Sequence, residues 1–184
     1  MSLRLAVAER CVPLPLRRRG LDELADAAAA GFGCPRPPWR GRCYADRLDQ
    51  FARFTADQAA LAAEAGRDAV VRDDLRRHAD DLGRRLRRRL GVRSHDEALR
   101  ALRVLYRQLQ IDLRARSATR IEVSSCLFSR VYDVSVCRVV SAVDEGITAG
   151  LTGGCELRFE RRITEGASTC VATLSRPGSC ARSS

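Results

Sequence analysis

The first two-thirds of the chain carries apolar residues at helical spacing. Between residues 67 and 90, apolar side chains recur every three or four positions, at Val71, Leu75, Ala79, Leu82, Leu86 and Leu90. This is the period of an amphipathic helix, and Gly91 suits its C-terminal cap. The same period predicts helices over 21–30 and 44–65. A further helix is predicted after a capping Ser94, with its stripe at Leu99, Leu102, Tyr106, Leu109 and Leu113.

Proline and glycine interrupt this helical part in two places. Residues 31–43 contain repeated Pro and Gly, which disfavour helix and predict a loop. Residues 1–20 contain Pro13, Pro15 and an arginine run, and are predicted to form an irregular arm.

The period changes after residue 115. Alternating apolar and polar residues predict strands over 119–125, 155–163 and 169–174, with a turn at Glu165 and Gly166 between the last two. Residues 129–150 return to helical spacing, and 176–184 are predicted to be a loose tail. The expected fold is α+β, with a helical region (1–115) and a cysteine-bearing region (116–184). The strand, helix and hairpin of the second region are expected to form a small antiparallel sheet packed on helices, within one integrated domain.

Charge at first suggests a nucleic-acid partner. The 184 residues have a formal net charge of +10, and all 33 basic residues are arginines. These arginines are spread along predicted helix faces, without the interleaved aromatics of a nucleic-acid surface. The composition therefore disfavours nucleic-acid binding, although attraction for small anions remains.

Cysteine content and the N-terminal residues bear on location. Eight cysteines are present, but the chain contains no apolar run of membrane-spanning length and the first residues do not resemble a secretion signal. We therefore expect a cytoplasmic protein with reduced thiols and no membrane partner. There is no Cys-x-x-Cys pair, so ordinary zinc-finger spacing is absent. The sequence leaves the oligomeric state open; a homo-oligomer formed through the N-terminal helices is one expectation.

Candidate chemistry is concentrated in the last third of the chain. If 129–150 is one helix, one of its faces carries Cys137, Ser141, Asp144 and Thr148. Cys170 lies on the last strand, and Cys126 at the exit of the first. Thiols, a hydroxyl and a carboxylate brought together are suited to nucleophilic catalysis, because a neighbouring group can orient and activate the thiol.

These residues also resemble a known family. The L-2-amino-thiazoline-4-carboxylic acid hydrolase-like family has an early Cys, a helix with Asp before Gly-Leu, then Phe-Glu-Arg and Gly-x-x-x-Cys. The corresponding positions here are Cys126, Asp144, Gly150-Leu151, Phe159-Glu160-Arg161 and Gly166 to Cys170. The resemblance covers about the last 60 residues. The segment is also similar to 4-vinyl-reductase-type small-molecule-binding domains, but Arg162 stands where those domains usually carry a second Cys.

The resemblance implies a cysteine-dependent hydrolase that opens a cyclic amidine derived from cysteine, in specialised metabolism. The chain departs from the family pattern at two points: Ala172 replaces a usual Phe, and Ser141 replaces a usual Cys. We expect Cys137 or Cys126 as nucleophile, Asp144 as orienting group or acid–base, and Cys170 as a positioning or resolving thiol. Arg130, Arg138 or a helix end would lower the thiol pKa. Substrate-binding positions are expected at Ser141, Phe128 and Arg138.

Two other functions remain open. Cys126, Cys137 and Cys170 are alternatively three thiolate ligands of zinc or of an iron–sulfur cluster. The second of these functions is that of a non-catalytic small-molecule-binding domain with no cofactor. Each cysteine also has a plain structural interpretation, since free Cys often fills space in a core. We favour that interpretation, or incidental exposure, for Cys34, Cys43, Cys155 and Cys180. His78 and His95 are expected in structural roles.

Overall fold

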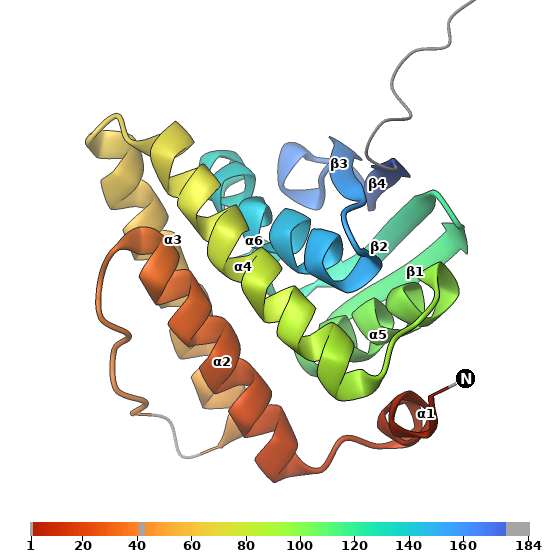
Figure 1. Ribbon diagram of the computed structural model, residues 1–184. Helices are drawn as coiled ribbons and strands as arrows, with labels where there is room; N and C mark the ends of the chain where they lie inside the picture. Colours follow the sequence, from red (N-terminus) through yellow and green to blue (C-terminus); the bar gives the residue numbers. More distant parts are fainter. Residues whose placement is uncertain (1, 41–42, 176–184) are drawn as a thin grey trace, which may run out of the picture.

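Helices occupy the N-terminal part of the chain and the sheet follows (Figure 1). The computed structural model describes residues 2–40 and 43–175. The helices are α1 (Leu3–Arg10), α2 (Leu14–Phe32), α3 (Tyr44–Glu64), α4 (Asp68–Leu90), α5 (His95–Gln108) and α6 (Val134–Thr152), with short 3-10 turns η1 (Leu127–Arg130) and η2 (Ile163–Glu165). The strands are β1 (Ile111–Ser117), β2 (Arg120–Cys126), β3 (Glu156–Arg161) and β4 (Cys170–Ser175). The α+β prediction is confirmed.

The four strands form one antiparallel sheet in the order β1-β2-β4-β3. In its register, Val123 of β2 lies opposite Cys170 of β4. Cys126 is three residues further along β2, so both cysteines come to the same end of the sheet. Helix α6 packs against the sheet on one side and against α4 on the other, while α2 and α3 lie beyond α4 (Figure 1).

Glycines let α4 and α6 approach very closely. A Cβ atom built on Gly146 would lie 2.2 Å from the carbonyl oxygen of Arg76, and one on Gly150 would lie 2.3 Å from that of Asp80. Both helices run in the same direction, and Arg72 of α4 donates to the Glu145 carboxylate of α6 at 2.9 and 3.1 Å. The close approach therefore turns the face of α6 that carries Gly146 and Gly150 toward α4.

The expectation of an irregular arm over residues 1–20 is wrong. Residues 3–10 form α1, and α2 begins at Leu14 with Pro15 in its first turn. Proline is accepted there because the first N–H groups of a helix have no intrahelical acceptor. The side chain of Leu5 is fully buried, so α1 is part of the core.

The expected helix after Ser94 is correct at its start and too long at its end. Ser94 and Glu97 form the cap, but the helix ends at Gln108. Gln110 takes a positive φ of 56°, after which β1 begins. Leu109 and Leu113 continue the helical stripe by coincidence, because Ile111 and Leu113 also satisfy the two-residue period of a strand. Strand β1 crosses position 115, where the two regions of the chain were divided.

Two further boundaries differ from expectation. Helix α6 starts at Val134, where the side chain of Asp133 accepts from the N–H of Val136, so residues 129–133 precede the helix.

A β-bulge falls between Phe159 and Arg161 of β3. An extra residue in a strand reverses which face the following side chains occupy, and Arg162 therefore points inward. Residues 41–42 of the predicted loop and the predicted tail 176–184, including Cys180, lie outside the described residues.

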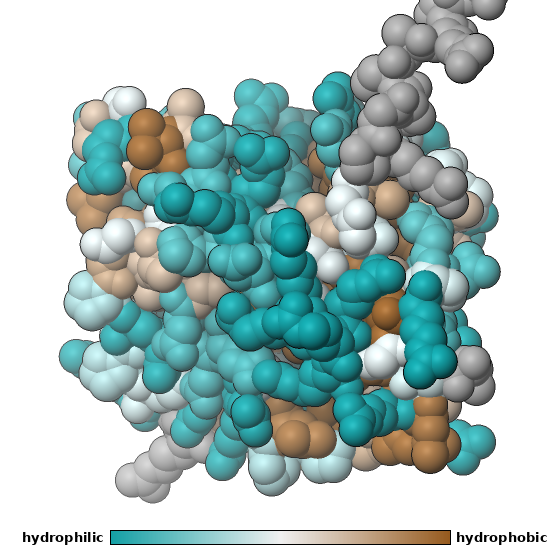
Figure 2. Space-filling model, in the orientation of Figure 1, coloured by the Kyte–Doolittle hydropathy of each residue, from teal (hydrophilic) through white to brown (hydrophobic). Residues whose placement is uncertain are grey.

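Charged side chains cover the visible face over α4, as Figure 2 shows, with apolar groups in separate places. Much of that charge is paired within the molecule, for example Arg84 with Asp80 and Arg77 with Asp74. Four apolar side chains near the N-terminus are exposed: Leu3, Val7, Leu14 and Leu16. None of the helices in the described residues has the length and apolar character needed to cross a membrane.

Candidate functional site

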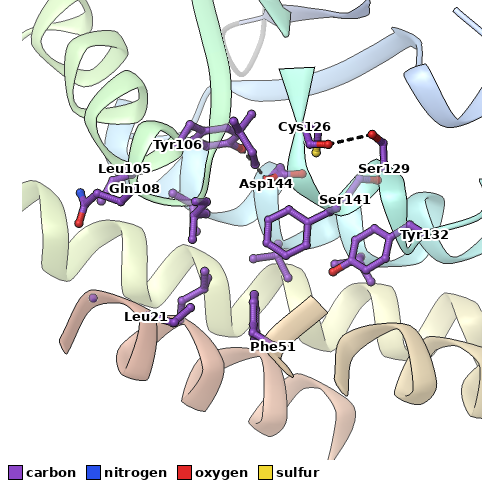
Figure 3. A pocket seen from close by; sticks show the side chains of 18 of the residues that line it. Leu21, Phe51, Leu105, Tyr106, Gln108, Cys126, Ser129, Tyr132, Ser141 and Asp144 are labelled. Atoms are coloured by element: carbon purple, nitrogen blue, oxygen red, sulfur yellow. Dashed lines mark hydrogen bonds between the residues drawn. The ribbon is translucent and has the colours of Figure 1, made fainter. Parts of the chain in front are cut away.

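A cavity of about 130 Å³ lies between the helices and one end of the sheet (Figure 3). Side chains from α2 to α6, β1, β2, β4, η1 and η2 line it. Most of these side chains are apolar, including Leu21, Phe51, Leu105, Val143 and Ile147. Such a mostly apolar cavity with a few polar groups is typical of a small-molecule site.

The structure brings most of the predicted site residues to this cavity. Its walls include the thiols of Cys126, Cys137 and Cys170, together with Phe128, Ser141 and Asp144. Helix α6 supplies three of these from successive turns, as its spacing predicted. The sheet register supplies the other two thiols, because β2 ends and β4 begins beside the start of α6.

Two candidate residues lie elsewhere. Arg138 is exposed, and its guanidinium pairs with Glu165 at 2.9 Å, outside the cavity wall. Thr148, on the same helical face as Asp144 in the sequence analysis, is buried against the sheet beside a much smaller cavity. Its hydroxyl has no hydrogen-bond partner among the described residues.

Asp144 forms the central polar contact of the cavity. The hydroxyl of Tyr106 on α5 donates to Asp144 Oδ1 at 2.5 Å. Burial raises the pKa of Asp144 to about 6, while the Tyr106 hydrogen bond and the nearby Arg162 act in the opposite direction. Burial also raises the pKa of Tyr106, which keeps its proton available for donation. A carboxyl group with a pKa near neutrality can both accept and return a proton.

The three cavity thiols are protonated at neutral pH. Burial raises the pKa of Cys126 to about 12, against the effect of the Ser129 and Phe128 N–H groups. Burial likewise raises the pKa of Cys137 and of Cys170. This is opposite to the expectation that a neighbouring cation leaves a thiolate. Arg130 and Arg138 are not among the groups that act on these thiols, and burial raises each pKa by more than the hydrogen bonds and the one nearby cation lower it.

Arg162 is the cation that does reach the thiols, and the sequence analysis missed it. It lowers the pKa of both Cys137 and Cys170, although less than burial raises them. Its side chain is 14% exposed and stacks over the ring of Phe159 at 4.7 Å. One guanidinium nitrogen also lies 3.4 Å from Ser141 Oγ. Strict alternation along β3 placed Arg162 on the solvent side, and only the bulge turns it inward.

Two tyrosines of the wall were also missed as functional candidates. Tyr106 was assigned to an apolar stripe, which is correct for its ring but not for its hydroxyl. Tyr132 follows η1, and its hydroxyl contacts that of the fully buried Thr55. The Thr55 hydroxyl has one proton, which it can donate to the carbonyl of Phe51 or Ala52, so Tyr132 is the donor in their contact. A tyrosine within an amphipathic stripe is the signal that could have found Tyr106.

The metal interpretation gains nothing from this arrangement. Within residues 2–40 and 43–175, no three His, Cys, Asp or Glu side chains are grouped as a metal site requires. Cys126, Cys137 and Cys170 line one cavity but do not form such a group. Among the described residues, these three thiols thus give no support to a zinc or iron–sulfur site.

The other cysteines take structural positions or lie at the surface. Cys43 caps α3, where its sulfur accepts from the N–H of Asp46 at 3.4 Å. Cys34 is partly buried and Cys11 is exposed. Cys155 is buried, and its sulfur lies 4.0 Å from His95 Nδ1, an approach that sequence separation did not suggest. None of these four cysteines lines the cavity.

The chain was compared with family models, curated proteins and solved structures. No family model, no curated protein and no solved structure matches this chain.

Substituting Tyr106→Phe is expected to raise the pKa of Asp144 above its value of about 6. The substitution removes the hydrogen bond that stabilises the carboxylate and leaves the burial unchanged. Carboxyl-carbon NMR titration of the two proteins measures the shift, with Asp144→Asn identifying the resonance. Tyr44→Phe is the control, because the Tyr44 hydroxyl donates to the Gln108 carbonyl at 3.1 Å instead. Equal midpoints in wild type and Tyr106→Phe would contradict the assignment.

Proposed function

We propose that this protein is a cysteine-dependent enzyme that hydrolyses or cleaves a small molecule carrying an electrophilic C=N carbon. The observation that carries this proposal is the convergence of Asp144 and three thiols on one largely apolar cavity. The resemblance of the last 60 or so residues to the thiazoline-carboxylate hydrolase-like family supports the same chemistry.

Cys137 is the best-placed nucleophile. It lies in the first turn of α6, where the helix dipole favours negative charge. Both Thr164 and Arg162 lower the pKa of its thiol, whereas Arg162 is not among the groups that act on Cys126. Cys170 accepts the N–H of Ile163 on its sulfur at 3.2 Å, which suits a fixed, positioning thiol.

The proposed step starts from a protonated thiol and an ionised Asp144. As the sulfur–carbon bond forms, the thiol proton passes to the carboxylate and the C=N electron pair moves to nitrogen. That nitrogen then takes the proton from Asp144. Cleavage of the ring C–S or C–N bond expels that ring atom with its electron pair and leaves the carbon bound to Cys137 as a cation. Water adds to this carbon, and the proton that it loses passes through Asp144 to the expelled sulfur or nitrogen. The adduct then collapses to C=O, which breaks the Cys137–carbon bond and returns the hydroxyl proton to the Cys137 sulfur.

The high thiol pKa couples reactivity to the bound substrate. In the empty cavity, transferring the Cys137 proton to Asp144 is unfavourable, because the thiol is the weaker acid by a wide margin. Bond formation to carbon offsets this cost only when an electrophile is in place. Reaction with a general alkylating agent should consequently be slow at the cavity and fast at exposed thiols.

The experiment uses a protein carrying Cys11→Ser and Cys43→Ser, so that the exposed thiols do not react. L-2-amino-thiazoline-4-carboxylic acid and 2-aminothiazoline are supplied, and ring opening and covalent adducts are followed by mass spectrometry. We expect Cys137→Ala to lower kcat/KM by roughly 10³-fold or more. Cys34→Ala, a partly buried cysteine outside the cavity, should leave it unchanged.

A non-catalytic binding protein is the second candidate, and the raised thiol pKa values favour it. It predicts that neither amidine is consumed, that no adduct forms, and that Cys126→Ala and Cys137→Ala retain ligand binding. Turnover that survives alanine at each of Cys126, Cys137 and Cys170 would also overturn thiol catalysis.

A further inference from the structure

The cavity has two chemically different ends. Figure 3 shows Cys126, Ser129 and Tyr132 toward one side of the cavity, Leu105 and Gln108 toward the other, and Asp144 between them. The first end holds the thiols and the acid–base group. Gln108 at the second end accepts the Tyr44 hydroxyl on its carbonyl at 3.1 Å, and Arg17 lies close enough to act on Tyr44. None of these three is suited to nucleophilic attack.

The cavity is long enough between these two ends to hold an elongated ligand. The cavity runs along α6 from Cys137 to Ile147, which is about 15 Å at 1.5 Å per residue. The wall beyond Asp144 is formed by leucines of several helices, among them Leu21, Leu82, Leu86 and Leu105. A molecule the size of an aminothiazoline would fill only the thiol end and leave this apolar stretch uncovered.

Arg17 gives the second end a positive charge. Its Nε donates to the carbonyl of Val12 at 3.0 Å, which positions the guanidinium at the start of α2. Among the described residues no carboxylate forms an ion pair with Arg17. Glu23, the acidic residue of the same wall, is already paired with Arg19 at 3.1 Å and Arg89 at 2.9 Å. The terminal nitrogens of Arg17 are thus free to bind an anion, which they can do in bidentate fashion.

We propose that the cavity takes an amphiphilic ligand: an apolar chain or ring system with one anionic head group, a carboxylate or phosphate, held by Arg17. The apolar body lies along the leucines toward Asp144. Only the presence of a reactive group on this ligand, at the thiol end of the cavity, rests on the proposed function. Binding of the anionic head group and of the apolar body does not depend on that function.

Isothermal titration calorimetry with decanoate and decanol tests this assignment in wild type, Arg17→Gln, Leu105→Trp and Arg10→Gln. Arg10→Gln is the matched control, since Arg10 is exposed on α1 and does not line the cavity. We expect Arg17→Gln to weaken decanoate by about tenfold, the order expected for one charge-assisted pair, and to leave decanol unchanged. Leu105→Trp fills the apolar stretch and should weaken both ligands; Arg10→Gln should weaken neither.

Three outcomes would overturn the proposal: no decanoate binding to wild type, equal losses of decanoate affinity in Arg17→Gln and Arg10→Gln, or wild-type affinity of Leu105→Trp for both ligands. Thermal unfolding of each variant distinguishes lost binding from lost folding. Cys137→Ala separates the two proposals. If it binds decanoate normally while wild type consumes no amidine, the ligand class stands and the proposed function fails. If wild type consumes an amidine but does not bind decanoate, the proposed function stands and the ligand class fails.

Discussion

Gly146→Ala is expected to lower the free energy of unfolding by about 3 kcal/mol, since overpacking against a rigid neighbour costs this order of energy. The added methyl would sit 2.2 Å from the Arg76 carbonyl oxygen and 2.7 Å from Ala79 Cβ. Neither atom belongs to a flexible side chain, so α4 and α6 must separate. For a domain of this size the loss corresponds to a fall in Tm of roughly 10 °C. Thermal unfolding followed by circular dichroism measures it.

Gly20→Ala is the matched control. Gly20 is also helical, but a Cβ there meets nothing within 4 Å. Alanine should stabilise the protein by about 0.5–1 kcal/mol, because it lowers the backbone entropy of the unfolded chain. If both substitutions shift Tm in the same direction and by similar amounts, the close approach of α4 and α6 is not what limits stability.

Asp144→Asn should abolish most of the proposed activity. The amide cannot accept the thiol proton, and loss of a positioned acid–base group costs roughly 10²–10⁴-fold in rate. In wild type the base is ionised only above its pKa, so kcat/KM should rise with pH through about 6. The pH–rate profile with an amidine substrate measures this. A variant that keeps wild-type rates would exclude Asp144 from the chemistry.

The same substitution should stabilise the fold at neutral pH. The pKa of Asp144 is about 6 in the folded protein and 3.8 as its ordinary value. Between these values the unfolded chain loses its proton first, so the unfolded state binds fewer protons and stability falls as pH rises. Asparagine avoids this penalty and can still accept from Tyr106. We expect a gain of about 2 kcal/mol at pH 7 that disappears near pH 3, as is usual for functional groups held at a cost in stability. Denaturant unfolding at both values measures it, and equal gains would contradict the raised pKa.

Local sequence determined most of the helices and the character of the site. The stripe from Val71 to Leu90, the cap at Ser94 and the spacing of Cys137, Ser141 and Asp144 are properties of neighbouring residues. They depend on the helical period alone, so they could be predicted without knowing what each helix packs against. The α+β class follows from the change of period after residue 115.

Tertiary structure decided what the site contains and how it is ionised. Tyr106 meets Asp144 only because α5 packs beside α6, and their 38-residue separation carries no local signal. The bulge in β3 reverses Arg162, and the sheet register brings Cys126 and Cys170 to one end. Burial then reverses the expected ionisation of the thiols, because desolvation depends on everything that surrounds a group. Residue types and their spacing specify which groups are available, whereas distance and burial, which determine their chemistry, are properties of the whole fold.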